Sequence, residues 1–209
     1  MWVALLAGAC ATELDVKDDS TFFPTLRVSK KLNHIWTIDA IADYAAGTDT
    51  ATGSTGTPIV IGGTSFPGAV QVDFDLTTVR VEARAHHDIS DTWLIEGFLG
   101  AALYYTDVTV TAGGVRGDDT QFTGGPEFGG RLGWRPAPRL QVYAESYLTY
   151  PFPDGIVPLG EFEAGLEWKA VGPMSVFGGW RWRNLELIRN DSDFDFEWSG
   201  VFLGLGFDF

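Results

Sequence analysis

The chain is poor in three features, and each shortage excludes a class of protein. Its 209 residues include a single cysteine, Cys10, so no disulfide can form within the chain. It has no run of 18 or more apolar residues, which argues against a transmembrane helix. The 14 Lys and Arg residues are outnumbered by 28 Asp and Glu, and the net charge of −14 argues against nucleic-acid binding.

Glycine and aromatic residues, in contrast, are abundant. The chain holds 26 glycines, and aromatic residues make up 14% of it. This composition is typical of many short strands joined by tight turns and does not suit a helical bundle. The length is enough for one barrel-sized domain.

Apolar and polar residues alternate with period two over most of the chain, which predicts β-strands. In 36–44, Trp36 and Tyr44 share an apolar face, and Asp39 and Asp43 lie on the opposite one. Similar alternation is found in 79–86, 122–134, 140–150, 160–170 and 176–183. Alternation is poor in 93–111, and the faces of that segment cannot be assigned from the sequence.

The phase of the alternation changes in two strands. The apolar residues Val70 and Phe74 are out of step with Val79, and Trp198 is out of step with Val201. We expect a β-bulge or the edge of the membrane at each change of phase.

The connections between strands fall into two classes that alternate along the chain. Short ones are predicted near 31–34, 87–91, 136–138 and 171–173, and longer or acidic ones near 47–68, 112–120, 151–158 and 190–193. An up-and-down barrel with tight turns at one end and long loops at the other has this pattern. The Thr- and Gly-rich segment 47–68 is predicted to be a mobile loop.

Counting the strands gives the expected fold class. Nine strands run from 22–30 to the C-terminal segment, and a barrel with both termini at the short-turn end needs an even number. Residues 12–16 are therefore predicted as a tenth strand, with 17–21 as an outer loop. The prediction is an all-β, antiparallel up-and-down transmembrane β-barrel of about ten strands, formed by one domain at 11–209. Eight strands are the alternative, if the N-terminal strands lie outside the barrel.

Aromatic residues favour a membrane barrel over a soluble, lipocalin-like barrel with the same alternation. Membrane barrels carry aromatic girdles at both interfaces with the lipid headgroups. The aromatic residues near predicted strand ends are Trp36, Tyr44, Trp93, Tyr150, Trp168, Trp180 and Trp198, with Trp134 and Trp182 fitting more roughly.

The C-terminal segment carries a more specific signal. Leu203, Leu205, Phe207 and Phe209 alternate with small or polar residues up to a terminal aromatic. This resembles the signal that the barrel-assembly machinery reads in bacterial outer-membrane barrels. The chain thus resembles the small porin-like, OmpA-like outer-membrane β-barrel superfamily. The resemblance implies the bacterial outer membrane as location, with outer-membrane lipid and the assembly machinery as partners.

The N-terminus has two interpretations. Residues 1–9, MWVALLAGA, followed by Cys10 resemble the end of a lipoprotein signal and make Cys10 a candidate for lipidation. A basic region is missing, so the signal would be truncated, and Ala7 stands where leucine is usual. The alternative is the start of a first strand, because 2–16 resembles 93–108.

Charged residues on the polar strand faces would point into the barrel. They are Arg80, Arg84, Glu127, Arg131, Glu145, Glu161, Glu163, Glu167, Arg181 and Arg183. A small barrel has a lumen that side chains can fill, and buried charges must pair. We expect a salt-bridged plug, with Arg131 near Glu145 and 161–167 near Arg181 and Arg183. A narrow polar channel is the alternative.

The sequence offers little for catalysis. Its only histidines, His34, His86 and His87, lie in or beside short turns, and no serine pairs with them recognisably. The alternate carboxylates Asp191, Asp193 and Asp195 are a weak candidate for a cation site, because they lack the spacing of an EF-hand.

The function expected from the sequence is therefore structural, anchoring or loop-mediated binding, by a non-enzymatic monomer without a cofactor. The alternatives are a narrow diffusion pore for small solutes and a surface enzyme.

Overall fold

The computed structural model describes residues 12–52, 59–61, 64–66, 69–150, 152, 159–189 and 192–209. Within these ranges it describes the side chains except at 12–20, 49, 51–52, 59–61, 185–189 and 192–196. Cys10 lies outside the described residues, and so does the whole segment 1–10, for which lipidation and strand formation stay predictions.

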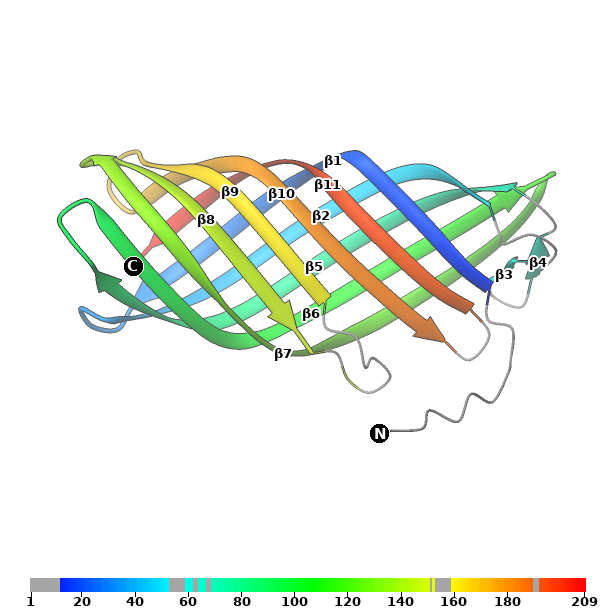
Figure 1. The fold of residues 1–209 in the computed structure, drawn as a ribbon, viewed down its shortest axis with the longest axis horizontal. Coiled ribbons are helices and arrows are strands. Elements are labelled where there is room, and N and C mark those ends of the chain that lie inside the picture. Colours follow the sequence, from blue (N-terminus) through cyan, green and yellow to red (C-terminus); the bar gives the residue numbers. More distant parts are fainter. Residues whose placement is uncertain are drawn as a thin grey trace, which may run out of the picture.

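The described part of the chain consists of strands and their connections. The strands are β1 (Thr12–Lys31), β2 (Trp36–Thr52), β3 (Ile59–Ile61), β4 (Thr64–Phe66), β5 (Ala69–Asp88), β6 (Trp93–Ala112), β7 (Val115–Ala137), β8 (Leu140–Thr149), β9 (Leu159–Lys169), β10 (Met174–Arg189) and β11 (Ser192–Asp208). Nine of the strands in these ranges form a closed barrel in the order β1-β11-β10-β9-β8-β7-β6-β5-β2, and β3 pairs with β4 (Figure 1). The predicted all-β barrel is thus confirmed. None of the described residues forms a helix long and apolar enough to span a membrane.

The strand count differs from the predicted ten because of how the barrel closes. Residues 12–16 and 22–30 belong to one strand, β1, and the expected loop at 17–21 is only a shift of register between Asp18 and Thr21. β1 pairs with β11 in parallel, whereas the other barrel pairs are antiparallel. A parallel closure allows an odd number of strands. β1 therefore starts at the end of the barrel away from Phe209.

The four short connections lie together at one end of the barrel, as predicted, and we call this the turn end. The prediction of a loop at 112–120 is wrong. β6 and β7 continue to a two-residue turn, Gly113–Gly114, whose φ angles are 58° and 83°. A hairpin turn of this kind needs positive φ at both central residues, and glycine supplies it without a Cβ clash.

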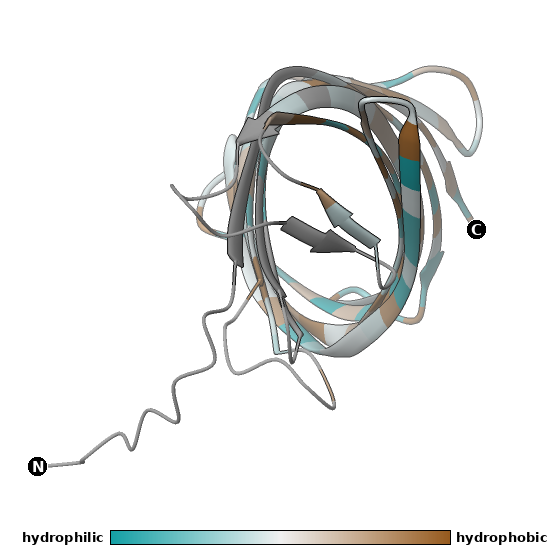
Figure 2. Cartoon of the chain, turned by 90° about the vertical axis from the view of Figure 1, so that its right-hand side faces the viewer, coloured by the Kyte–Doolittle hydropathy of each residue, from teal (hydrophilic) through white to brown (hydrophobic). Residues whose placement is uncertain are grey.

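Within 47–68, expected to be a mobile loop, the described residues 47–52, 59–61 and 64–66 form strands. β2 continues to Thr52, and β3 and β4 form a hairpin that contacts β1, β11 and β7. Viewed along the barrel, β4 lies across its opening (Figure 2). Phe66 of β4 is 1% exposed and belongs to the apolar core, so burial of its ring holds the hairpin in the mouth of the barrel.

The predicted bulge in β5 is absent, since its pairing with β2 and β6 is regular over its whole length. Even-numbered residues face inward from Val70 to Arg84 without a break. What changes is the chemistry of the inward set, which is apolar from Val70 to Leu76 and polar from Thr78 to Arg84. We call the part of the barrel at the level of Ala69–Leu76 the loop-end half, and the part at the level of Thr78–Asp88 the turn-end half.

β11 behaves like β5, with regular pairing to β10 across the change of phase. Trp198 and Phe202 are both buried in the lumen, whereas Val201, Leu203 and Leu205 face outward. Trp198 was predicted as a girdle residue, and this is wrong, because its side chain is 0% exposed and its ring centroid lies 4.9 Å from that of Phe74.

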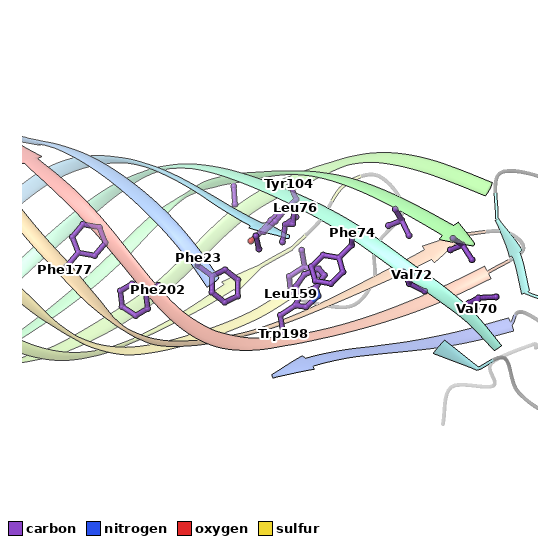
Figure 3. Close-up of a cluster of buried hydrophobic side chains, with 14 of the residues drawn as sticks. Phe23, Val70, Val72, Phe74, Leu76, Tyr104, Leu159, Phe177, Trp198 and Phe202 are labelled. Carbon is purple, nitrogen blue, oxygen red and sulfur yellow. The ribbon is translucent and has the colours of Figure 1, made fainter. Parts of the chain in front are cut away.

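The apolar core fills the lumen of the loop-end half (Figure 3). Its main members are Phe66, Val70, Val72, Phe74, Leu76, Val108, Val110, Leu159 and Trp198. Phe23, Phe177 and Phe202 extend it toward the turn end on the β1–β11–β10 side. At the same level the outward residues of β5, among them Gln71, Asp75 and Thr77, are polar.

The outer face of the turn-end half is apolar instead. Its exposed residues include Val79, Val81, Leu99, Leu166 and Leu203, which are 43–65% exposed. Exposed aromatic residues lie at both edges of this apolar outer face. At the edge near the turns they are Trp36, Trp93, Trp134 and Trp168, and at the edge next to the loop-end half they are Tyr44, Tyr105, Phe122 and Tyr150.

Candidate functional site in the charged lumen

Inside the turn-end half lies a cluster of ionised side chains, which we call the charged belt. Because every second residue of a strand points into the barrel, strands whose inward-facing residues are charged place those charges together in the lumen. Its buried members are Arg27, Asp39, Asp43, Arg80, Glu82, Arg84, Glu127, Arg131, Glu145, Glu161, Glu163, Glu167, Arg181 and Arg183. Each of them is at most 8% exposed.

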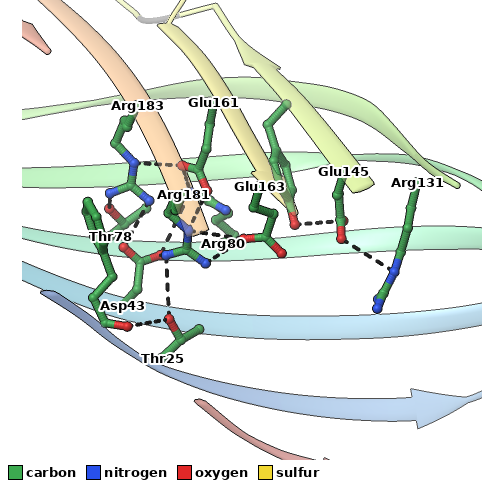
Figure 4. A network of polar contacts seen from close by, with 12 residues as sticks. Thr25, Asp43, Thr78, Arg80, Arg131, Glu145, Glu161, Glu163, Arg181 and Arg183 are labelled. Carbon is green, nitrogen blue, oxygen red and sulfur yellow. Dashed lines mark hydrogen bonds and ion pairs between the residues drawn. The ribbon is translucent and has the colours of Figure 1, made fainter. Parts of the chain in front are cut away.

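One part of the charged belt is centred on Arg80, Arg181 and Arg183 (Figure 4). Arg181 donates through Nη2 to Glu163 Oε2 at 2.7 Å, and Arg183 donates through Nε to Glu161 Oε2 at 2.6 Å. Arg80 reaches the same Glu161 from the other side of the barrel. Asp43 accepts a hydrogen bond from Arg183 Nη2 at 3.0 Å. These contacts tie β2, β5, β9 and β10 together through the lumen.

The other part lies toward the turn end. Arg84 donates through Nη2 to Glu145 Oε1 at 2.6 Å and through Nη1 to Glu96 Oε2 at 3.0 Å. Glu167 bridges two arginines, since Arg131 lies 2.9 Å from its Oε2 and Arg27 lies 2.5 Å from its Oε1. Sharing a carboxylate between two guanidinium groups stabilises both charges in a site with little water access.

Aromatic rings and hydroxyl groups complete the surroundings of the arginines. The Cζ of Arg131 lies 3.7 Å from the ring centroid of Tyr143, and that of Arg84 lies 4.7 Å from the ring of Phe98. Such contacts between a cation and an aromatic face are attractive. The Tyr147 hydroxyl donates to Glu145 Oε1 at 2.7 Å. Guanidinium groups that pack on aromatic rings fill more of the lumen than ion pairs alone would.

The charge of the belt is close to balanced, with an excess of carboxylates. Its buried members comprise six arginines and eight acidic residues. Arg80, Arg181 and Arg183 are each at most 2% exposed, so they fill the lumen at mid-height. An interior built this way is a packed polar plug at that level.

All ten lumen residues named from the sequence lie inside the barrel and are buried. The sequence also anticipates the neighbour pairs: Arg131 lies 3.8 Å from Glu145, and Arg181 and Arg183 contact Glu163 and Glu161. Glu167 differs from the expectation, because it pairs with Arg27 and Arg131 and not with Arg181 or Arg183.

Four members of the belt are not among the ten lumen residues named from the sequence. They are Arg27, Asp39, Asp43 and Glu82. Asp39 and Asp43 were visible as the polar face opposite Trp36, and Arg27 alternates with the outward Leu26 and Val28 in the same way. Arg135, four residues beyond Arg131 on β7, lies at the turn-end rim, where it pairs with Asp88 at 2.9 Å.

A cavity of about 250 Å³ opens at the turn end and reaches down to the charged belt. Arg27, Arg84 and Arg131 form its floor, and Lys31, Arg135 and Lys169 belong to its wall. It is the place where solutes from that side of the barrel can approach the buried charges.

The histidines lie where the sequence predicts them, in or beside the short turns. His86 contacts Glu96 through Nδ1 at 3.1 Å and Asp88 through Nε2 at 3.0 Å. Within the described residues no group of three or more His, Cys, Asp or Glu side chains could hold a metal ion. The cation candidate formed by Asp191, Asp193 and Asp195 lies outside the residues whose side chains are described.

The C-terminal residues proposed as an assembly signal lie on the outer face of β11 and at its end. Leu203 and Leu205 are 53% and 44% exposed, Phe207 is half-buried, and Phe209 is 71% exposed. Phe209 is fixed to β1 by two backbone hydrogen bonds, from its own N to Ser29 O and from Lys31 N to its O.

Residues 91–209, more than half of the chain, match the model of the family described as YfaZ precursor. No curated protein and no solved structure matches the chain at a significant level.

Proposed function

Because this chain belongs to the YfaZ precursor family and folds as a closed β-barrel, we propose that it is an outer-membrane barrel protein. In this proposal the turn-end half spans the bilayer with its turns on the periplasmic side. The loop-end half extends beyond the membrane into water. The earlier resemblance to small porin-like and OmpA-like barrels is part of the same proposal.

The observation that carries the proposal is the reversal of amphipathicity along the strands. In the turn-end half, Val81 and Leu166 face outward while Arg80 and Glu163 are buried. In the loop-end half, Val72 and Phe74 are buried while Asp75 faces outward. A soluble barrel would keep one arrangement throughout, whereas a barrel that leaves the membrane must exchange the two faces at the interface.

The lumen favours a structural or loop-presenting role over transport. Arg80, Arg181 and Arg183 fill it at mid-height, and Phe74 and Trp198 fill it above them. We propose a non-enzymatic barrel that strengthens the envelope or presents its loop end to partners, with outer-membrane lipid around it. Insertion by the barrel-assembly machinery through Leu203, Leu205, Phe207 and Phe209 belongs to the proposal.

Site-specific labelling tests the membrane orientation. Leu166→Cys and Glu163→Cys, each in a Cys10→Ser background, place a thiol on opposite faces of β9. In the membrane-inserted protein we expect the thiol at 166 to accept a lipid-partitioned label and resist water-soluble reagents. The thiol at 163 should reject the lipid label. Rapid aqueous labelling at 166 in membrane fractions would contradict the proposal.

Planar-bilayer conductance tests the closed lumen. We expect no stepwise conductance from the purified protein. Arg181→Ala combined with Arg183→Ala, which removes side chains from mid-lumen, is the variant in which leak currents should first appear. Steady ion-selective steps from the unmodified protein would instead establish the narrow diffusion pore.

A further inference from the structure

The cavity at the turn end differs in charge from the rest of the molecule. The chain as a whole carries a net charge of −14. The cavity is lined by six Lys and Arg side chains and four carboxylates, and its floor residue Arg84 also pairs with Glu82 and Glu145 behind the lining. The excess of cations is therefore on the wall, at Lys31, Arg135 and Lys169. A cationic wall in an acidic protein concentrates anions locally.

The carboxylates inside the cavity are mostly occupied by arginines of its floor. Arg84 lies 3.2 Å from Asp39 and 3.0 Å from Glu96, and Glu167 is shared by Arg27 and Arg131. Their negative charges are therefore offset within the site. Asp208 is the remaining carboxylate, and it lies at the exposed rim.

The cations of the wall are not offset in this way. In the described part of the chain, Lys31 and Lys169 have no carboxylate within salt-bridge distance, although both line the cavity. Arg135 is engaged by Asp88, which lies outside the lining and is more than half exposed. Two lysines thus line the cavity without an ion-pair partner among the described residues.

A buried donor points to the same place. Arg27, which lines the cavity, gives its Nη2 to Glu167, and its buried Nε–H has no acceptor among the described residues. A buried N–H without an acceptor is costly, and an oxyanion would satisfy it.

We propose that this cavity binds a small soluble oxyanion, a phosphate or carboxylate compound with at least two negative charges, which enters along the barrel axis from the turn end. Lys31 and Lys169 hold its outer acid group, and Arg27 receives the inner one. The volume of about 250 Å³ is slightly below the range of ordinary small-molecule sites, which fits a compact ligand. Nothing in this site requires that the lumen conduct.

Two neighbouring lysines provide a matched comparison. Lys31 lines the cavity, whereas Lys30, the preceding residue on β1, points to the outer face of the barrel. Substituting either lysine by glutamine removes the same charge from the same end of the molecule, so only a local site distinguishes the two variants.

The experiment is a calorimetric titration of inorganic pyrophosphate into the purified protein in a sugar-based, phosphate-free detergent at low salt. We expect saturable binding with one site per chain. Lys31→Gln combined with Lys169→Gln should weaken it at least about tenfold, as expected for lost charge-assisted contacts. Lys30→Gln should leave the affinity within about twofold, since an exposed charge acts weakly through screened solvent.

Three outcomes would overturn the proposal. The first is the absence of saturable pyrophosphate binding, and the second is an equal loss of affinity in Lys30→Gln. The third is displacement of pyrophosphate by a stoichiometric amount of anionic phospholipid in the micelles, which would make a lipid headgroup the occupant. Circular dichroism of each variant checks that the barrel is intact. Because binding is measured in detergent, the result does not depend on membrane orientation or on conductance. The anion-binding proposal and the proposed function can therefore fail independently.

Discussion

The two halves of the barrel use the same strands in opposite ways. β5 runs through both without a bulge, yet its inward residues are Val72 and Phe74 in one half and Arg80 and Arg84 in the other. In the loop-end half, apolar burial inside and polar groups outside match a surrounding of water. In the turn-end half, the arrangement is reversed and matches a surrounding of lipid.

The comparison shows that a change in phase of hydrophobicity does not require a change in backbone. A bulge would move each later side chain of a strand to the other face. Here the side chains keep their faces, and in the proposed membrane orientation the medium on the outside changes instead. The aromatic residues Tyr44 and Tyr105, both exposed near the change in β2 and β6, lie where a membrane interface would be.

The largest expected effect comes from breaking the charged belt. Arg181→Ala leaves Glu163 and Glu161 without one of their buried partners. We expect the free energy of unfolding to fall by about 3–5 kcal/mol, as for other broken buried ion pairs. Urea titration of the refolded protein measures it, and Asp118→Ala at an exposed position is the control, with a change within about 0.5 kcal/mol. Equal midpoints for the two variants would mean that Arg181 is solvated.

The apolar half should respond to the loss of volume. Phe74→Ala removes a ring that is 2% exposed and whose centroid lies 4.9 Å from that of Trp198. We expect a loss of stability of about 3 kcal/mol, typical of a large cavity in a core. Phe74→Leu, which refills much of the space, should restore most of it. If Phe74→Ala were as stable as the unmodified protein, the loop-end lumen would not be a packed core.

An added charge on the outer face separates the two halves most directly. Leu166→Arg places a cation on the outer belt of the turn-end half, and in phospholipid vesicles this should cost about 2–4 kcal/mol. Gln71→Arg makes a comparable change on the outer face of the loop-end half and should cost less than about 0.5 kcal/mol. Comparable losses for both variants in vesicles would place both positions in the same medium.

The smallest expected effect concerns the turn between β6 and β7. Gly114 has a φ of 83°, and Gly114→Ala puts a Cβ into a backbone conformation that favours glycine. We expect a loss of about 1–2 kcal/mol, since the turn is exposed and only local strain is added. Thermal unfolding of the two proteins side by side tests it. An unchanged midpoint would mean that the turn relaxes to another type.

Much of the charged belt could be predicted from the sequence, because alternation fixes which residues share a face. Arg181 and Glu163, on strands adjacent in sequence, were expected together and lie 2.7 Å apart. Contacts across the lumen could not be predicted. Arg80 meets Glu161 and Arg27 meets Glu167 only because the sheet closes on itself. In 93–111 the faces stayed unassigned because Phe98 is an inward apolar residue that packs on Arg84 and Tyr147.

By itself the sequence determined that the chain forms a barrel with short turns at one end and charges inside, because period-two alternation and turn residues are local properties of a strand. Only the tertiary structure decided the count of nine, the parallel pairing of β1 with β11 and the fusion of 12–16 with 22–30 into one strand. Closure, the capping of the mouth by the β3–β4 hairpin and the cavity at the turn end all depend on residues distant in sequence. They are set by which strand edges and side chains meet in space, and alternation along one strand carries no information about that.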